Sequence, residues 1–312
     1  MAGTMRAVRF AEYGPPDVLR LDRVERPVIE PGQLVVEVHA TGVHPIDTKL
    51  RGGMLREWMP LELPFTPGHD FAGVVDEVGE DVAGYEPGVR VFGRAAGTYA
   101  EHVVASADET ALIPAELSFE QAAAIPVGAG TAWGAVFDVA DVRKGQRVLV
   151  QGGAGGVGHN AVQLARWKGA QVSATASAAN GEFVRRLGAD TVIDYQAQRF
   201  EDVVDDIDAV IDTVGGDVLE RSFSVLRPGA ILVSIAGQPS QDTAAELGVR
   251  AASAQGTVTG ERLARIAGLA AEGSLLIGVG EVFAFEQAAA AHALSETGHG
   301  RGRILLRVTA ED

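Results

Sequence analysis

The sequence predicts an α/β protein of two domains, one rich in β-strands and one built on a doubly wound parallel sheet. Three observations predict this class: short β-branched runs in the first third of the chain, apolar strands that alternate with helices from residue 147 onward, and a glycine motif where one such strand meets a helix. With 312 residues, 46% of them hydrophobic, the chain is long enough to bury a core in each domain.

The first third of the chain carries runs of strand-forming residues separated by Gly, Pro and Asp. The expected strands are 6–10, 34–38, 72–77, 90–92 and 102–104. Further on, Ser118 followed by Gln121 forms a capping box, which predicts the start of a helix that continues through an Ala-rich stretch. We therefore place the first domain boundary near residue 121.

The second half alternates strands and helices, as is typical of a parallel sheet with crossover helices. Its expected strands are 148–151, 172–175, 191–193, 209–212 and 231–235. Helix 261–271 is expected to close this domain, and strands 281–285 and 304–308 are expected to return to the first domain. The predicted domains are thus 1–121 with 273–312, and 122–272.

Composition excludes several classes of partner. The 26 basic and 42 acidic residues leave a net charge of -16, which repels both nucleic acid and anionic membranes. No run of eighteen apolar residues occurs and the start lacks the features of a secretory signal, so we expect a cytoplasmic protein. The absence of cysteine excludes disulfides, thiolate metal ligands and nucleophilic thiols.

The clearest chemical motif is the glycine loop 153–158, which follows strand 148–151 and opens a helix. Gly153 permits the tight turn, Gly155 lets the backbone approach a pyrophosphate, and Gly158 lets the helix pack closely on the sheet. The loop also contains Gly156 and Val157, and free N–H groups at a helix start bind anions. This context predicts a dinucleotide site, and the alternative is an ordinary tight turn.

The end of the second strand of this domain indicates which dinucleotide is bound. An acidic residue there would bind the ribose 2'-hydroxyl of NAD, but the run 174–180 contains none. Ser177 and Asn180 offer a hydroxyl and an amide, which accept a 2'-phosphate without charge repulsion. The sequence therefore predicts NADPH as the cofactor. Ser177 is equally suited to be a helix N-cap, and one residue can do both.

The run Gly68-His69-Asp70-Phe71-Ala72-Gly73 resembles the signature of medium-chain dehydrogenases and reductases. The similarity extends over essentially the whole chain. The glycine loop and Val192-Ile193-Asp194-Tyr195 most resemble the quinone oxidoreductase, or zeta-crystallin-like, branch. The resemblance implies a GroES-like catalytic domain, a Rossmann domain, and an NADPH-dependent enzyme that reduces quinones or activated enones. It also implies a homodimer that pairs through an edge strand, for which 249–254 is a candidate, although a buried strand would suit that segment equally.

The resemblance also assigns further cofactor contacts. Thr131 and the strand ends at Val214 and Ile235 are expected near the nicotinamide. Ser177 and Tyr195 are expected near the adenosine phosphate.

One position departs from the pattern of the family. Asn180 stands where many relatives have a lysine that binds the 2'-phosphate. That role is therefore expected to pass to Arg303, Arg185 or Arg186.

Zinc dehydrogenases of the superfamily hold a tetrahedral metal at positions that here read His44, His69 with Asp70, and approximately Val127. The third of these positions offers no metal ligand, so we expect no metal. The alternative is a zinc-dependent alcohol dehydrogenase that uses His44, His69 and Asp70, all legitimate zinc ligands.

Without a metal, the substrate must itself be electrophilic, and the protein mainly positions hydride donor and acceptor. His44 and Lys49, which flank Asp47, are the candidates to hydrogen-bond the developing enolate oxygen. Asp47 is expected to anchor the loop or orient a partner. The alternative for His44 is plain packing in the interior, and the alternative for Lys49 is a solvated position at the surface. A further alternative for the whole protein is that it binds NADPH without catalysing a reaction.

Overall fold

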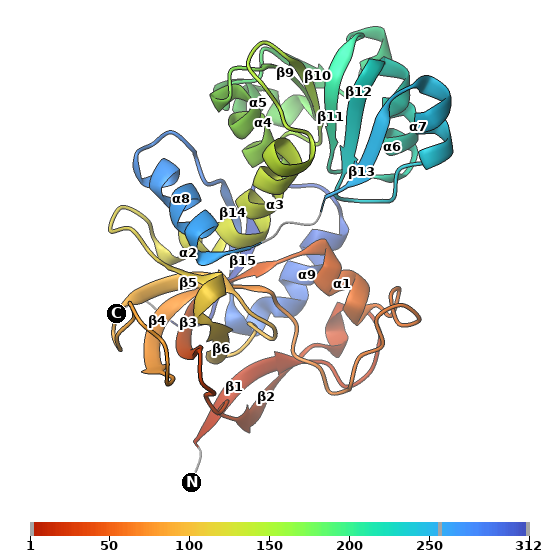
Figure 1. The fold of residues 1–312 in the computed structure, drawn as a ribbon. Helices are drawn as coiled ribbons and strands as arrows, with labels where there is room; N and C mark the ends of the chain where they lie inside the picture. The colour runs from red at the N-terminus through yellow and green to blue at the C-terminus, as the bar shows by residue number, and fades with distance from the viewer. Residues whose placement is uncertain (1–2, 255–257, 310–312) are drawn as a thin grey trace. The chain divides into compact units, whose positions relative to one another are not determined.

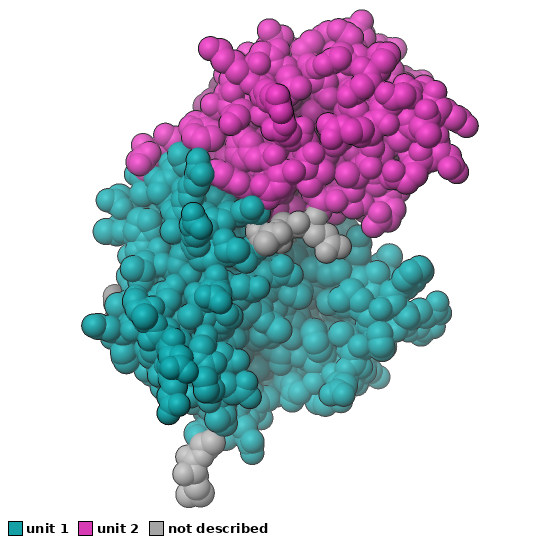
Figure 2. All heavy atoms as spheres, viewed as in Figure 1, with its two compact units in different colours: residues 1–127, 258–271, 279–312 teal, residues 128–257, 272–278 magenta. Residues whose placement is uncertain are grey.

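The computed structural model describes residues 3–254 and 258–309, and the chain forms two compact units (Figure 2). Unit 1 comprises residues 1–127, 258–271 and 279–312, and unit 2 comprises residues 128–257 and 272–278. The predicted α/β class is confirmed, since unit 1 is rich in β-strands and unit 2 has a parallel sheet with crossover helices.

The described residues of unit 1 form nine strands in two sheets. Their bounds are β1 (Thr4–Arg9), β2 (Arg20–Glu25), β3 (Gln33–Val43), β4 (Asp70–Val78), β5 (Arg90–Arg94), β6 (His102–Ser106), β7 (Thr110–Leu112), β14 (Val279–Ala284) and β15 (Arg303–Arg307). Strands β1 and β2 form a separate pair, and the larger sheet has the order β14-β15-β3-β4-β5-β7 with β6 paired to β3. All strands predicted for this part of the chain are present. Strand β2 was not predicted because its sequence is charged and largely exposed, without an alternating apolar pattern.

The long strand β3 organises the core of unit 1. Its side chains Leu34, Val36 and Val38 are fully buried. They pack with Phe71 of β4 and Leu306 of β15, the strands on either side of β3 in the sheet. Burial of β3 along most of its length fixes the register of the two strands beside it, β15 and β4. This register determines where the polar residues described below lie.

In the part of unit 1 that the structure describes, the α-helices are α1 (Pro45–Arg51), α2 (Phe119–Ala123), α8 (Gly260–Ala271) and α9 (Ala288–Glu296). Helix α8 was expected to close the parallel-sheet domain, but it packs against β7 of unit 1. A Cβ on Gly260 at its start would lie 2.3 Å from the carbonyl oxygen of Thr110. The amphipathic pattern of α8 shows that the helix buries one face, but it does not show on which sheet.

Unit 2 is built on one six-stranded parallel sheet of order β10-β9-β8-β11-β12-β13 (Figure 1). The strand bounds are β8 (Arg147–Gln151), β9 (Gln171–Ala176), β10 (Thr191–Asp194), β11 (Ile207–Asp212), β12 (Leu226–Ser234) and β13 (Arg250–Ser253). All five predicted strands are present, and β13 lies at the sheet edge. The chain first builds from β8 toward β10 and then from β11 toward β13, so the order reverses between β8 and β11. Open α/β sheets bind their ligands at the carboxyl ends of strands at such a reversal.

The helices of unit 2 are α3 (Gly130–Trp133), α4 (Gly158–Trp167), α5 (Gly181–Arg186), α6 (Gly216–Arg221) and α7 (Gln241–Leu247). Helices α4 and α5 pack on β8, β9 and β10, and α7 packs on β13. Helix α4 also holds the short segment 272–278. The side chain of Gln163 donates to the carbonyl of Leu276 (2.9 Å) and accepts from its N–H (2.8 Å), and His159 Nε2 accepts from Gly278 N–H (3.0 Å). These contacts explain why 272–278 belongs to unit 2, which the predicted boundary at 272/273 does not capture.

The helical stretch 119–139 begins at the predicted capping box. The Ser118 hydroxyl accepts from the Gln121 N–H (3.2 Å), and the Gln121 side chain accepts from the Ser118 N–H (3.0 Å). Two π-helical segments, Ile125–Ala129 and Gly134–Val139, interrupt the stretch. The stretch is long and apolar enough to cross a membrane, but 72% of its most apolar window is buried in the structure, as in the core helix of a folded domain.

Candidate active site

The glycine loop of unit 2 presents free backbone donors. The Gly153 N–H donates to the carbonyl of Thr175 (2.8 Å), and the Gly155 N–H donates to that of Gly152 (3.0 Å). Within residues 3–254 and 258–309, the N–H groups of Gly156 and Val157 donate to no protein acceptor. Both lie immediately before the start of α4, where the positive end of the helix dipole also attracts an anion.

Sterics separate the roles of the three motif glycines. A Cβ on Gly158 would lie 2.1 Å from the carbonyl oxygen of Gly152, and one on Gly153 would lie 2.8 Å from the Cβ of Ala174. A Cβ on Gly155 would meet nothing closer than 3.4 Å. The protein's own packing therefore requires Gly153 and Gly158, whereas Gly155 leaves space open to a bound group. This geometry fits the diphosphate of a dinucleotide.

The residues expected near the adenosine phosphate follow β9 and β10. Ser177 directly follows β9, and its hydroxyl accepts from Asn180 Nδ2 (3.3 Å) but caps no backbone N–H. Tyr195 follows β10, is 50% exposed, and donates its N–H to the carbonyl of Ala176 (3.2 Å). The structure therefore brings Ser177 and Tyr195 to neighbouring strand ends.

The three arginines considered for the 2'-phosphate lie in different surroundings. Arg303 belongs to unit 1 and is only 5% exposed. The expectation that it binds the 2'-phosphate is therefore corrected, because its side chain is buried. Arg186 has an ion pair with Glu182 at 3.9 Å. The Nη1 atom of Arg185 lies 3.7 Å from the point where a Cβ on Gly181 would stand, one residue after Asn180. The guanidinium of Arg185 thus lies beside Gly181, which directly follows Asn180 in the chain.

The residues expected near the nicotinamide also belong to unit 2. Val214 follows β11 and is 51% exposed, and Ile235 follows β12. Thr131 lies on α3 and is partly buried. The buried carboxylate of Asp212 holds this edge, because it accepts from the N–H of Val214 (3.1 Å) and from the hydroxyl of Ser234 (2.6 Å). Sequence reasoning missed this role of Asp212, whose only signal is its place at the end of a buried strand.

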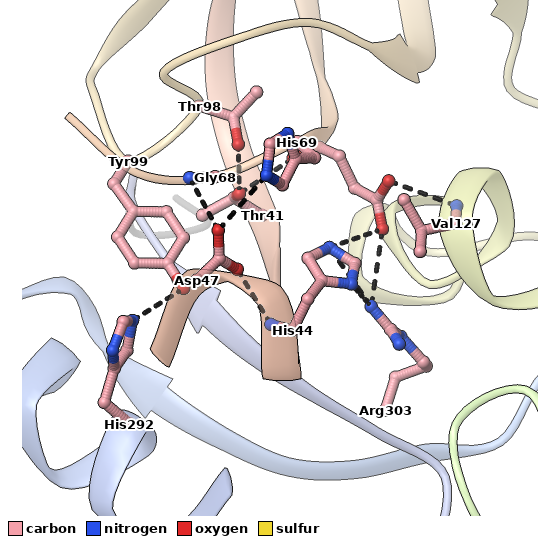
Figure 3. Close-up of polar contacts among 11 residues, drawn as sticks. Thr41, His44, Asp47, Gly68, His69, Thr98, Tyr99, Val127, His292 and Arg303 are labelled. Atoms are coloured by element: carbon pink, nitrogen blue, oxygen red, sulfur yellow. Dashed lines mark hydrogen bonds and ion pairs between the residues drawn. The ribbon is translucent and has the colours of Figure 1, made fainter. Parts of the chain in front are cut away.

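Strand register brings a second group of polar residues together in unit 1 (Figure 3). Strand β15 pairs antiparallel with β3, with Ile304 opposite Val43, so Arg303 stands across from His44. On the other side of β3, Thr41 pairs with Phe71, so Asp70 stands across from Gly42. Gly42 and His44 are two positions apart along the chain, so the register brings Arg303, His44 and Asp70 together at this end of the three strands.

The side chains of these three residues are in direct contact. The guanidinium of Arg303 contacts both ring nitrogens of His44, with Nη2 3.1 Å from Nε2, and lies 3.6 Å from Asp70 Oδ2. The Nε2 atom of His44 lies 3.1 Å from the same carboxylate oxygen. The other oxygen of Asp70 accepts from the N–H of Val127 (3.1 Å), in the π-helical segment. We call Arg303, His44 and Asp70 the buried triad; each is at most 5% exposed.

Burial shifts the proton affinities in this triad. Desolvation, supported by the nearby Arg303 charge, lowers the pKa of His44 well below its usual range. Desolvation raises the pKa of Asp70 to about 7, although Arg303 opposes this shift. The His44 imidazole is therefore neutral at neutral pH, and the positive charge of the triad resides on Arg303.

Asp47 anchors the start of α1. Its carboxylate accepts from the N–H of His44 (2.8 Å) and from that of Gly68 (3.2 Å), and it is fully buried. Nε2 of His69 lies 3.5 Å from Asp47 Oδ1. His69 is thus associated with Asp47, not with its neighbour Asp70. Lys49, two residues after Asp47, is exposed on α1.

A buried tyrosine lies close to Asp47 and is paired with a buried histidine. The hydroxyl of Tyr99 lies 3.2 Å from Nε2 of His292 on α9, and both side chains are fully buried (Figure 3). Burial raises the pKa of Tyr99 well above its usual value, and the charge of Asp47 adds to this shift. Burial likewise lowers the pKa of His292 to about 4, with the charge of Arg51 acting in the same direction. Sequence reasoning missed this pair, which comes from segments 193 residues apart.

His292 gives a prediction for the pH dependence of stability. Its pKa is about 4 in the folded protein and 6.5 in the reference state, so the unfolded chain gains a proton first as the pH falls. The stability that neutral His292 contributes is therefore complete above pH 6.5 and is lost toward pH 4, by about 3 kcal/mol. We expect His292→Gln to lose less stability than the wild type over this interval, measured by urea unfolding at each pH. His299→Gln is the control, because the ring of His299 is exposed. If the stability of His292→Gln depended on pH in the same way as that of the wild type, the prediction would be contradicted.

Comparisons with known proteins agree with this architecture. Residues 30–115 match the alcohol dehydrogenase GroES-like domain, and residues 187–306 match the zinc-binding dehydrogenase family. The chain is 32% identical to a quinone oxidoreductase of Sus scrofa, covering 96% of this chain and 95% of the relative. It is 33% identical to a 2-methylene-furan-3-one reductase of Solanum lycopersicum, covering 97% of this chain and 79% of the relative. Among solved structures, the quinone oxidoreductase from Coxiella burnetii is similar with a TM-score of 0.90 and 36% identity, covering 98% of this chain and all of that one.

The fold and the glycine loop define an oxidoreductase with a GroES-like domain and a Rossmann domain that binds a nicotinamide cofactor. The chain belongs to the medium-chain dehydrogenase/reductase superfamily, in its quinone oxidoreductase branch.

Proposed function

We propose that the protein transfers a hydride from NADPH to a quinone or an activated enone without the help of a metal. The glycine loop carries this proposal, because its two unpaired N–H groups and the open space at Gly155 suit a dinucleotide diphosphate. Support for the substrate class comes from the two relatives above, one named for quinones and one for an enone.

Each part of the reaction has a candidate residue. The nicotinamide, when bound, supplies the hydride. Gly156 and Val157 would hold the diphosphate through their N–H groups. Lys49, exposed on α1, is the proposed cation for the oxygen on which negative charge develops. His44 was expected to share that role, but its ring is 2% exposed and engaged by Arg303 and Asp70, so we assign it a positioning role instead.

The activity is tested by a spectrophotometric screen of small quinones, enones and secondary alcohols with NADPH and NADH. We expect quinones or enones to oxidise NADPH and secondary alcohols to be inert. Activity with secondary alcohols alone would contradict the proposal, and no turnover with any acceptor would indicate a cofactor-binding protein without catalysis.

We expect Lys49→Ala to lower kcat by about 10-fold or more, the loss of one charge-stabilising contact of about 1.4 kcal/mol, while the Kd of NADPH stays unchanged. Lys49→Arg should restore part of the rate because it keeps the charge. Stopped-flow turnover and fluorescence titration of NADPH measure the two quantities. Lys168→Ala, at the end of α4, is the matched control, and an equal loss of NADPH affinity in Lys49→Ala would contradict the assignment.

NADPH is proposed over NADH because no acidic residue stands at the end of β9 and the guanidinium of Arg185 lies beside Gly181, the residue after Asn180. Comparing KM for NADPH and NADH in the wild type and in Arg185→Ala tests this proposal. A preference for NADH in the wild type would contradict it.

We also propose a homodimer in the cytoplasm. The edge strand β13 has one side unpaired within the described residues, which suits pairing with the same strand of a second copy. The dimer is tested by comparing the sedimentation of the wild type with that of Ala252→Pro, a substitution in the middle of β13. A wild-type monomer would contradict it.

A further inference from the structure

The buried triad of unit 1 has the donors of a metal site but contains a cation of the chain itself. We infer that the Arg303 guanidinium occupies the position between His44 and Asp70 that a metal ion would need, and that it closes this site to metals. This inference concerns the metal chemistry of the site, and it does not depend on whether the substrate is a quinone.

The donors alone are suited to a metal. An imidazole nitrogen of His44 and a carboxylate oxygen of Asp70 lie 3.1 Å apart. Zinc binds both kinds of donor at about 2.0–2.2 Å, so one ion could contact both atoms. A further imidazole is near, since the ring centres of His44 and His69 are 6.0 Å apart. The family match to zinc-binding dehydrogenases raises the same question.

With Arg303 in place, the described residues nevertheless do not hold a metal. Among them, no three metal-binding side chains are grouped so that they could hold an ion. Nε2 of His69 faces Asp47 at 3.5 Å. Val127, where zinc-binding relatives are expected to have a third ligand, contributes only a backbone N–H, which fixes the other oxygen of Asp70. His44 and Asp70 are thus the two donors of the site, and an ion that replaced the guanidinium would take water as its remaining ligands.

The guanidinium takes up the remaining space. It contacts both ring nitrogens of His44 and lies 3.6 Å from the Asp70 oxygen, so a metal approaching either donor would meet it. Arginine keeps its charge at every accessible pH, and in this buried position it would repel a divalent cation strongly. A planar guanidinium also satisfies a carboxylate without needing the water that a metal would keep.

Gly42 provides the room for this arrangement. A Cβ at that position would lie 2.9 Å from both Asp70 Oδ2 and His44 Nε2. The bare backbone of β3 therefore allows the three side chains to meet across three strands. The register of β15 against β3 and the absence of a side chain at Gly42 together fix the position of the Arg303 guanidinium. A surface arginine could move away from an approaching metal, but Arg303 is held in place.

Cobalt(II) alone is a suitable probe, because it takes the same ligands as zinc and its visible absorption reports the donor set. We expect the wild type to bind no Co²⁺ at this site by equilibrium dialysis and absorption. Arg303→Ala should bind one Co²⁺ per chain, and Co²⁺ should raise its Tm but not that of the wild type. The double variant Arg303→Ala/His44→Ala should lose both effects. Arg307→Ala, an exposed arginine on the same strand, is the matched control.

Two results would overturn the inference: one Co²⁺ bound by the wild type and lost in His44→Ala, or a folded Arg303→Ala that binds no more Co²⁺ than Arg307→Ala. If Arg303→Ala does not fold, Arg303→Gln takes its place, because it removes the cation and keeps a polar side chain. It should bind Co²⁺, whereas Arg303→Lys and the wild type, which keep a cation, should not. Oxidation of NADPH by quinones is measured separately, so failure of the proposed function and failure of this inference are distinguishable.

Discussion

Replacing Gly158 by alanine is expected to weaken NADPH binding by at least about 100-fold, the equivalent of about 2.7 kcal/mol. The new Cβ would lie 2.1 Å from the carbonyl oxygen of Gly152, so either the loop or the start of α4 must move. Such overpacking lowers the free energy of unfolding by about 1–3 kcal/mol. Because the unpaired N–H groups of Gly156 and Val157 lie in the same turn, the shift would also misplace the proposed diphosphate donors.

Gly155→Ala separates the binding effect from the stability effect. Its Cβ would meet nothing closer than 3.4 Å, so Tm should stay near the wild-type value while NADPH affinity falls. Gly268→Ala, with open space around the Cβ on helix α8, should leave NADPH affinity unchanged and raise Tm slightly, because alanine favours a helix more than glycine does. Fluorescence titration with NADPH and thermal unfolding measure both quantities. Wild-type affinity in Gly158→Ala, or a loss of Tm in Gly155→Ala as large as in Gly158→Ala, would contradict this division of roles.

Removing the carboxylate of the buried triad should have the second large effect. Asp70→Ala leaves the buried Arg303 cation without its partner and the Val127 N–H without its acceptor. Loss of one member of a buried ion pair lowers the free energy of unfolding by about 3–5 kcal/mol. The measurement is urea unfolding at pH 8, above the Asp70 pKa of about 7, so that the carboxylate of the wild type is mainly ionised.

A double-mutant cycle identifies the cause. Asp70→Ala combined with Arg303→Met removes both charges, and it should recover part of the stability that Asp70→Ala alone loses. Glu182→Ala, which breaks an exposed pair with Arg186, supplies the control and should lower stability by only about 0–1 kcal/mol. Additive effects of Asp70→Ala and Arg303→Met would contradict the direct coupling of the two charges.

The sequence predicts the glycine loop well because its requirements are local. Gly158 is needed within the motif, where a Cβ would meet the carbonyl of Gly152, and Gly153 is needed where the loop meets Ala174 on the next strand of the same βαβ unit. The capping box at Ser118 is local in the same sense, and it correctly marks the start of the helical stretch. Strands with an alternating or continuous apolar pattern, such as β3 and β8, were also predicted, whereas the charged strand β2 was not.

The place of Arg303 in the buried triad could not be predicted, because it comes from a segment far from the other two members. Arg303 and His44 are 259 residues apart and meet only through the register between β15 and β3. Sequence patterns give strands but not their order, so Arg303 was assigned to a phosphate in the other unit and His44 to a substrate. The same reason explains α8, whose apolar stripe at Leu263, Ile266 and Ala267 is evident in the sequence while the sheet that it covers is not.

The contacts between segment 272–278 and α4 limit where the chain can be cut to produce a fragment or a chimaera. A recombinant fragment that stopped after the last strand of the parallel sheet would lack Leu276 and Gly278. The amide of Gln163 and Nε2 of His159 would then lose the main-chain groups that they bind in this segment. Chimaeras that exchange the cofactor-binding half with a relative should therefore carry both pieces, 128–257 and 272–278, from the same parent.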